Sequence, residues 1–205
     1  MPRLILASAS PRRRELLARC GIPFTVATAE VEELKRSADP AALPRLNAER
    51  KAAAVAALYP DALTLGADTV ILCRGEIIGK PRDLTDATAI LRRLSGRTHE
   101  VLTGIAFRCP ARGIESSFTA TTAVRFRKLD EAAIARYLAA VPVLDKAGAY
   151  ALQEHGDWLI ESVEGEPENV IGLPVRQVAA GLAALGMTPG GEFSETGLTN
   201  PADDV

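Results

Sequence analysis

The middle of this 205-residue chain contains two long β-rich runs, and they constrain its fold more than any other feature. Residues 99–108 and 114–127 are joined by the short link 109–113, whose proline and glycine are typical of a hairpin connection. Because a hairpin pairs its two strands antiparallel, a purely parallel sheet is not expected. Strand and helix patterns alternate before this hairpin, so the sequence predicts a mixed α/β class.

Capping residues, prolines and glycines bound the other predicted elements. Further strands are expected at residues 4–7, 23–27, 63–73, 76–78 and 158–163. Helices are expected to follow the caps Ser10, Asp39, Asp83 or Thr85, and Asp130, and to end near residues 20, 58, 94 and 140, with a last helix at 174–185. We expect one domain over residues 1–186 and a disordered tail, rich in Gly, Pro, Thr and Asp, over residues 187–205.

Composition narrows the class of protein. Hydrophobic residues make up 47% of the chain and charged residues 24%, as in an ordinary globular protein. Aromatics at 4% and a net charge of −2 argue against a nucleic-acid binder, which would be basic or rich in stacking side chains. Cys20, Cys73 and Cys109 form no C-x-x-C pair, so neither a zinc site nor a disulfide framework is indicated. With no long apolar run and no signal-peptide pattern, we expect a cytoplasmic protein that binds no membrane.

Three arginines, Arg12, Arg13 and Arg14, lie where the first helix is expected to begin. A helix N-terminus carries about +0.5 charge, so cations are unfavourable there unless an anion accompanies them. The serine hydroxyls of Ser8 and Ser10 and the unpaired backbone N–H groups favour a multiply charged phosphate as that anion. The alternative is a plain solvated face, because arginine is a good helix former.

Asp68 lies inside the strongest predicted strand, an apolar run, directly after a Gly-Ala pair. An ionised carboxylate is costly in such a run unless it has a cation or a hydrogen-bond donor beside it. The small neighbours indicate close approach to a ligand, whereas a strand with Asp68 on its wet face is the alternative reading. Glu30, Glu32 and Glu33 could join Asp68 around a Mg²⁺ ion, or they could form a solvated loop.

Three further features of the sequence give weaker indications of a functional site. The segment 75–81, Gly-Glu-Ile-Ile-Gly-Lys-Pro, is one residue short of a P-loop and has a proline in place of the required Ser or Thr. Lys80 in that segment could still present a point charge to a phosphate. The amide of Gln153 offers a donor and an acceptor and could read the edge of a base. His99 and His155 show no metal or triad spacing, so we expect them to be structural or exposed.

As an ordered set, short segments across the chain resemble the Maf family of nucleoside triphosphate pyrophosphatases. The matching segments are residues 7–13, 32–33, 51–52, 66–69, 79–81, 94–96, 103–104, 145–150 and 172–174. The resemblance implies hydrolysis of a nucleoside triphosphate between its α and β phosphorus atoms, with Mg²⁺ or a similar divalent ion such as Mn²⁺. It also implies a two-lobed Maf/ITPase-like fold around a twisted mixed β-sheet, with flanking helices, a nucleotide cleft between the lobes and often a homodimer.

The resemblance also assigns roles to individual residues. Asp68 matches the catalytic base that activates the attacking water, and with Glu33 it matches the metal-site carboxylates. Arg13 is expected to support the phosphates, and Arg14 to lie in solvent. The positions that hold the triphosphate correspond to Ser8, Arg12, Lys51 and Lys80.

The substrate inference rests on Arg12, Thr69 and Gln153, which match the specificity positions of the branch that acts on dTTP and UTP. Two departures from that branch are Glu154-His155 in place of a usual glycine, and Gly-Glu-Pro at 165–167 in place of a Gly-Ser-Tyr-like turn. The alternatives are a 7-methyl-GTP pyrophosphatase and a nucleotide-binding regulator of septum formation or cell division with little turnover. Retention of Asp68, Lys51 and Lys80 favours an enzyme, because a mere binder needs no general base.

Overall fold

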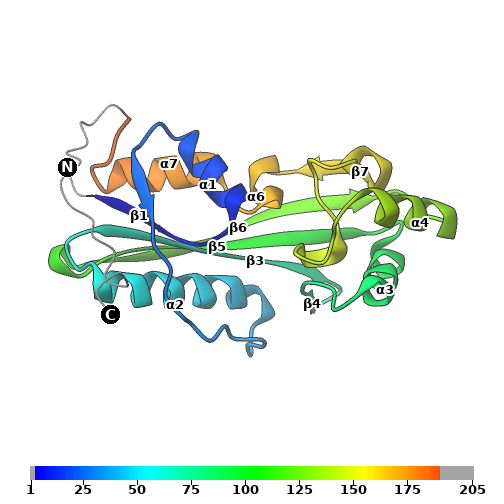
Figure 1. The fold of residues 1–205 in the computed structure, drawn as a ribbon, viewed down its shortest axis with the longest axis horizontal. Helices are drawn as coiled ribbons and strands as arrows, with labels where there is room; N and C mark the ends of the chain where they lie inside the picture. Colours follow the sequence, from blue (N-terminus) through cyan, green and yellow to red (C-terminus); the bar gives the residue numbers. More distant parts are fainter. Residues whose placement is uncertain (1–2, 190–205) are drawn as a thin grey trace, which may run out of the picture.

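The computed structural model describes residues 3–189, which fold around one long, twisted seven-stranded sheet (Figure 1). Along the sheet the strand order is β2-β1-β3-β5-β6-β7, with β4 also paired to β3. β1 is parallel to β2 and β3, and all other pairings are antiparallel, so the predicted mixed sheet is confirmed. The strands are β1 (Leu4–Ala7), β2 (Phe24–Val26), β3 (Leu63–Cys73), β4 (Glu76–Ile78), β5 (Thr98–Cys109), β6 (Ile114–Phe126) and β7 (Ile160–Glu164).

Helices cover both faces of this sheet. In Figure 1, α2 lies below the sheet, while α1, α6 and α7 lie above it. The α-helices are α1 (Pro11–Ala18), α2 (Leu43–Leu58), α3 (Leu84–Leu94), α4 (Glu131–Ala140), α5 (Gly156–Leu159), α6 (Pro167–Ile171) and α7 (Val175–Ala184). Three single turns of 3-10 helix are η1 (Pro40–Ala42), η2 (Pro110–Arg112) and η3 (Ala147–Ala149). Within residues 3–189, no helix is both long enough and apolar enough to cross a membrane.

The predicted helix caps form hydrogen bonds to the first turns of their helices. Ser10 accepts from the backbone N–H of the third helical residue of α1, and Asp130 does the same for α4. Asp83, rather than Thr85, caps α3. Asp39 caps η1 and not α2, so the single helix predicted from residue 40 begins as a separate 3-10 turn.

The strand predicted at residues 158–163 is wrong at its first two positions. These belong to α5, and β7 begins only at Ile160. His155 adopts a left-handed φ of 53°, and its carbonyl accepts from the N–H of Trp158, so the chain turns once before it becomes extended. The short α5 and α6 had no periodic signal, because four or five residues are too few to show one.

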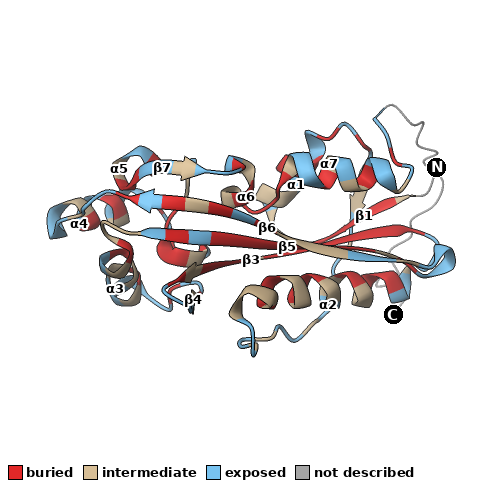
Figure 2. Cartoon of the chain, turned by 180° about the vertical axis from the view of Figure 1, so that it is seen from behind, coloured by how far each residue is buried: buried red, intermediate tan, exposed pale blue. Residues whose placement is uncertain are grey.

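Two clusters of buried side chains fill the two ends of the sheet and define two lobes. The first includes Leu65 and Phe107 together with side chains of α1 and α7, and the second includes Ile71 and Phe126 together with α3 and α4. Buried positions follow β3 and β5 from one lobe into the other (Figure 2). Met187, where the predicted tail begins, is 3% exposed and packs in the first lobe, and residues 190–205 lie outside the described residues.

Two glycines let α2 approach the sheet more closely than any side chain would allow. A Cβ atom on Gly66 would overlap the backbone of α2 at Ala48 and Ala52, and one on Gly104 would overlap the backbone at Pro44 and Arg45. The helix therefore rests on the sheet almost backbone to backbone. From this position the side chains of Asn47 and Lys51 reach Asp68, the cross-strand partner of Gly104.

His99 is a buried structural residue of the second lobe. Its Nε2 atom lies 2.8 Å from the hydroxyl of Tyr150, and its ring meets Phe126 edge to face. Its other ring nitrogen has no hydrogen-bond partner among the described residues. Because burial penalises the charged imidazolium, the pKa of His99 falls to about 4.

We expect Gly104→Ala to destabilise the protein by about 1–3 kcal/mol or more, because the new methyl group must push α2 away from the sheet. The free energy of unfolding in urea measures the effect. Gly79→Ala is the matched control, since a Cβ there meets nothing within 4 Å, and it should change stability by less than about 0.5 kcal/mol. Equal stabilities of the two variants would contradict the close approach of α2.

Burial of neutral His99 also predicts a pH dependence of stability. The unfolded chain binds a proton at His99 near pH 6.5, while the folded chain does so only near pH 4. The contribution of neutral His99 to the free energy of unfolding is therefore fully present above about pH 6.5. It falls as the pH drops toward 4, by up to about 1.4 kcal/mol per pH unit. Urea unfolding at several pH values should show this slope in the wild type and a flatter one in His99→Gln. An unchanged slope in the variant would rule out His99 as the cause.

Candidate active site

The candidate site lies where the two lobes meet, at an interruption in one edge of β3. On that edge β1 pairs with residues 63–66 of β3, and β4 pairs with residues 71–73. Among the described strands, none pairs with residues 67–70 there, although β5 covers the opposite edge throughout. Asp68 and Thr69 therefore lie in an open stretch of strand, one on each face of the sheet.

On the α2 face, Asp68 is held by two side chains of that helix. The Lys51 Nζ atom lies 2.7 Å from Asp68 Oδ1 and 2.7 Å from Glu33 Oε1. The Asn47 amide donates to Asp68 Oδ2 at 3.3 Å and exchanges two hydrogen bonds with the backbone of Leu34, next to Glu33. Asp68 is only 8% exposed, so these contacts supply the compensation that a buried carboxylate needs.

Sequence reasoning missed Asn47. The available signal was its position one helical turn before Lys51, which places both side chains on the same face of α2. Its role became visible only when Asp68 and Leu34 were brought to it from other parts of the chain. Asn47 is 3% exposed and ties the loop that carries Glu33 to the helix.

Positive charge from several elements converges on Glu33. The hydrogen bond from Lys51 lowers the pKa of Glu33, against the opposing effect of partial burial, and the charges of Lys51, Lys80 and Arg13 lower it further. Glu33 is therefore ionised at neutral pH.

Two carboxylates, Glu33 and Asp68, are available to a metal ion at this site. Within residues 3–189, no group of three or more His, Cys, Asp or Glu side chains is arranged to hold a metal. Mg²⁺ in proteins commonly takes one or two carboxylates and completes its shell with waters and substrate phosphates, so this donor set fits it. Glu30 and Glu32 are exposed, as the solvated-loop reading expected.

On the opposite face, Arg13 is fixed by three acceptors. Its guanidinium donates to the carbonyl of Gly172 at 2.9 Å, to the hydroxyl of Ser8 at 3.3 Å and to the hydroxyl of Thr69 at 3.0 Å. Burial lowers the pKa of Arg13, while the charges of Asp68 and Glu33 act in the opposite sense. An arginine stays protonated under these conditions, so Arg13 presents a fixed positive charge.

The structure separates the three arginines. Arg13 enters the polar network, Arg14 is exposed as predicted, and Arg12 forms a 2.8 Å ion pair with Asp145 of the other lobe. The structure brings Arg13 next to Ser8 and Thr69, while the expected role of Arg12 toward the triphosphate stays a prediction. One turn of helix cannot direct three consecutive side chains to the same place.

Lys80 and Gln153 both belong to the second lobe and are exposed. The carbonyl of Gly79 accepts a hydrogen bond from the N–H of Gly148 at 3.0 Å, which ties the loop of Lys80 to η3. Gln153 precedes α5 and makes no side-chain hydrogen bond to another described residue of the site. The structure thus joins six of the predicted site residues into two groups of three, one on each face of the sheet: Ser8, Arg13 and Thr69, and Glu33, Lys51 and Asp68.

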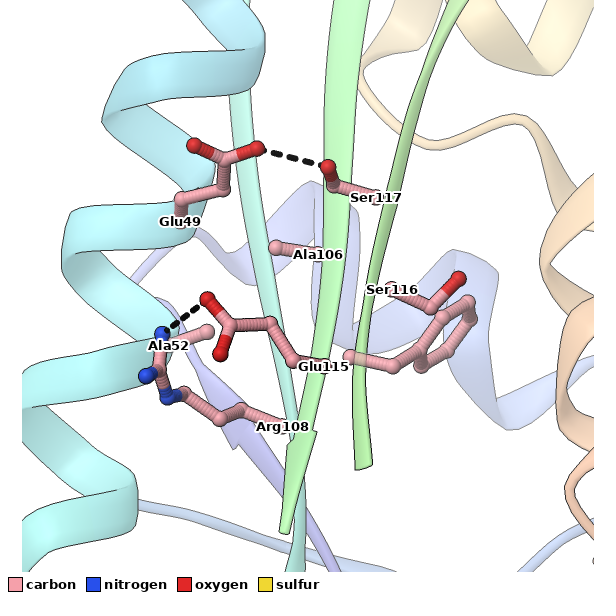
Figure 3. A pocket seen from close by; sticks show the side chains of 8 residues that line it. Glu49, Ala52, Ala106, Arg108, Glu115, Ser116 and Ser117 are labelled. Carbon is pink, nitrogen blue, oxygen red and sulfur yellow. Dashed lines mark hydrogen bonds and ion pairs between the residues drawn. The ribbon is translucent and has the colours of Figure 1, made fainter. Parts of the chain in front are cut away.

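A shallow pocket elsewhere in the first lobe contains none of the predicted site residues (Figure 3). It lies between α2 and the hairpin of β5 and β6. Glu49 on its wall accepts a hydrogen bond from Ser117 at 2.6 Å, and Arg108 pairs with Glu115 at 2.9 Å. Glu49 also pairs with Arg45 of α2, so each charged group on the wall of this pocket already has a partner.

The fold defines the chain as a two-lobed α/β protein of the kind seen in the Staphylococcus aureus Ham1 protein. That solved structure superposes with a TM-score of 0.52 over 89% of this chain and 99% of its own, at 15% sequence identity. The sequence model of the Maf-like protein family matches residues 3–185, and the chain belongs to that family.

Similar proteins extend over nearly the whole chain. A dTTP/UTP pyrophosphatase of Akkermansia muciniphila is 49% identical over 187 residues, which cover 91% of this chain and 98% of that protein. A dTTP/UTP pyrophosphatase of Moorella thermoacetica is 49% identical, with 91% and 97% covered. A dTTP/UTP pyrophosphatase of Symbiobacterium thermophilum is 47% identical, with 91% and 95% covered.

Proposed function

We propose that this protein is a nucleoside triphosphate pyrophosphatase that hydrolyses dTTP and UTP to the nucleoside monophosphate and pyrophosphate. The observation that carries this proposal is the buried Asp68 carboxylate, held by Lys51 beside the open stretch of β3. A buried, ion-paired carboxylate at the junction of two lobes is a typical place for a general base. The similar dTTP/UTP pyrophosphatases support the same activity.

In the proposed reaction, Asp68 takes a proton from a water molecule as that water attacks the α-phosphorus. The new P–O bond forms while the bond to the bridging oxygen breaks, and pyrophosphate leaves with the electron pair. Negative charge builds on the phosphoryl oxygens and on the leaving group. Lys51, Arg13 and Lys80 would offset that charge, and the Ser8 hydroxyl would donate a hydrogen bond to it.

We also propose that Glu33 and Asp68 are the protein ligands of a divalent ion, Mg²⁺ or Mn²⁺. When bound, such an ion neutralises phosphate charge and makes water a better acid. Both carboxylates contact Lys51, whose ammonium group marks the place between them that favours a cation. We assign recognition of the pyrimidine base to Arg12, Thr69 and Gln153. The proposed substrates are free nucleotides. We further propose that the protein acts in the cytoplasm and forms a homodimer.

The purified protein with Mg²⁺ should convert dTTP and UTP to monophosphate and pyrophosphate in preference to CTP, GTP and 7-methyl-GTP. Product identification by ion-exchange chromatography separates the possibilities. Faster turnover of 7-methyl-GTP would assign the protein to the other branch. Nucleotide binding without turnover would favour the regulator of septum formation, and release of orthophosphate would exclude a pyrophosphatase.

Asp68→Asn should abolish turnover while it leaves nucleotide binding largely intact, because the amide keeps the shape of the side chain and cannot accept the proton of water. Loss of a general base costs typically 10²–10⁴-fold in rate. Asp61→Asn is the control, since Asp61 is exposed just before β3 and should keep full activity. If Asp68→Asn lost binding and turnover to the same extent, the assignment as base would be refuted.

A further inference from the structure

A chain of hydrogen bonds leads from Arg13 along one face of the sheet to a backbone carbonyl of α6. The Arg13 guanidinium donates to Thr69 at 3.0 Å, and the hydroxyls of Thr69 and Thr103 lie 3.0 Å apart on the neighbouring strands β3 and β5. Thr103 in turn donates to the carbonyl of Asn169 at 3.3 Å. Thr69 and Thr103 are direct cross-strand partners, so the sheet itself sets the distance between their hydroxyls.

Hydrogen accounting gives this chain one direction. A guanidinium only donates and a carbonyl only accepts, whereas each hydroxyl has a single hydrogen to give. Thr103 donates its only hydrogen to the carbonyl of Asn169, so the bond between the two hydroxyls must use the hydrogen of Thr69, which also accepts from Arg13. Each of the two hydroxyls donates once and accepts once, which leaves no freedom to reorient without breaking the chain.

Two backbone carbonyls of one short segment, those of Asn169 and Gly172, hold Arg13 in place, and we call this arrangement the clamp. The carbonyl of Gly172 accepts directly from the guanidinium, and that of Asn169 accepts through the two threonines. The Asn169 side chain is fully buried and donates to the carbonyl of Val101 at 3.0 Å and to the hydroxyl of Thr122 at 3.1 Å. The segment is therefore anchored to β5 and β6, and it can hold the guanidinium in one orientation.

The clamp leaves part of Arg13 free for a ligand. A guanidinium has five N–H donors, and the three hydrogen bonds to Gly172, Ser8 and Thr69 occupy three of them. The Arg13 guanidinium donates to no other acceptor among the described residues, so two of its N–H groups remain without a partner there. One belongs to each terminal nitrogen, Nη1 and Nη2, and arginine binds phosphate oxygens through such N–H groups.

We propose that Thr103 is a positioning residue, which orients Arg13 toward a substrate phosphate through the hydroxyl of Thr69. The proposal rests on the proposed triphosphate substrate and adds a residue that touches neither substrate nor the reacting atoms. Thr103 is fully buried. Its influence on a ligand must therefore pass through Thr69 and Arg13.

Thr64 provides a matched control on the same sheet. It is also a fully buried threonine, it lies near the start of β3, and its hydroxyl has no hydrogen-bond partner among the described residues. Thr→Val replaces the hydroxyl by a methyl group at both positions and keeps the branched shape. Thr64→Val removes no hydrogen bond, whereas Thr103→Val leaves the hydrogen of Thr69 without an acceptor.

The experiment compares the full-length wild type with Thr103→Val, Thr103→Ser and Thr64→Val in the presence of Mg²⁺. Steady-state hydrolysis of UTP gives KM and kcat, and calorimetry gives the Kd of inorganic triphosphate. Urea unfolding verifies that each variant is folded under the assay conditions. The triphosphate carries its charge before as well as during the reaction, so a misplaced Arg13 should weaken binding in both states.

We expect Thr103→Val to raise KM about tenfold and to change kcat by less than about twofold, the pattern that marks lost uniform binding. The Kd of inorganic triphosphate should rise by a similar factor. Thr103→Ser keeps the hydroxyl and should recover most of the affinity, and Thr64→Val should match the wild type. A Thr103→Val variant with the constants of Thr64→Val, or a Thr103→Ser variant as impaired as Thr103→Val, would overturn the proposal.

Failure of the proposed function has a different signature. A wild type that hydrolyses no nucleoside triphosphate would refute the pyrophosphatase activity, while the Kd of inorganic triphosphate still tests the role of Thr103. A wild type that turns over UTP, combined with an unaffected Thr103→Val variant, would refute only the positioning role.

Discussion

The close approach of α2 to the sheet is the constraint on which the site depends. Gly66 and Gly104 remove the side chains that would keep the helix at an ordinary distance. The backbone of α2 then lies low enough for Asn47 and Lys51 to reach Asp68. A buried carboxylate without these partners would cost several kcal/mol, so the glycines, the helix and the charge cluster form one interdependent arrangement.

The interruption in the edge of β3 opens this arrangement to a ligand. Neighbouring residues of a strand point to opposite faces, which normally separates them by the thickness of the sheet. Where neither β1 nor β4 covers the edge, Asp68 with Lys51 and Thr69 with Arg13 border the same open stretch. A ligand at this stretch would then lie within reach of groups from both faces.

Local signals in the sequence predicted most of the fold. The β5–β6 hairpin, the caps Ser10, Asp83 and Asp130, and the two-lobed α/β class each depend on residues close together in the chain or on a resemblance over its whole length. Asp68 was predicted because a charge inside an apolar strand is conspicuous by itself. The short helices α5 and α6 were missed because they have too few residues for a periodic pattern.

The partners of the site residues could not be predicted in the same way. Asn47 bonds to Leu34 and Asp68, and Arg13 bonds to Gly172, which is 159 positions away in the sequence. Such contacts depend on the packing of α2 and α6 against the sheet, and no single segment encodes them. The different partners of Arg12 and Arg13 have the same origin, since Asp145 and Gly172 both lie far from the arginines in the sequence.

The continuity of β3 and β5 has a mechanical consequence for the two lobes. The pairing of these strands runs without a break from Thr64 opposite Arg108 to Leu72 opposite Glu100, and so passes through both lobes and the site. A hinge between the lobes would have to bend a fully hydrogen-bonded ladder. We therefore expect adjustment to a nucleotide to come from side chains and from the surface segments that carry Lys80, Asp145 and Gln153, rather than from bending of these strands.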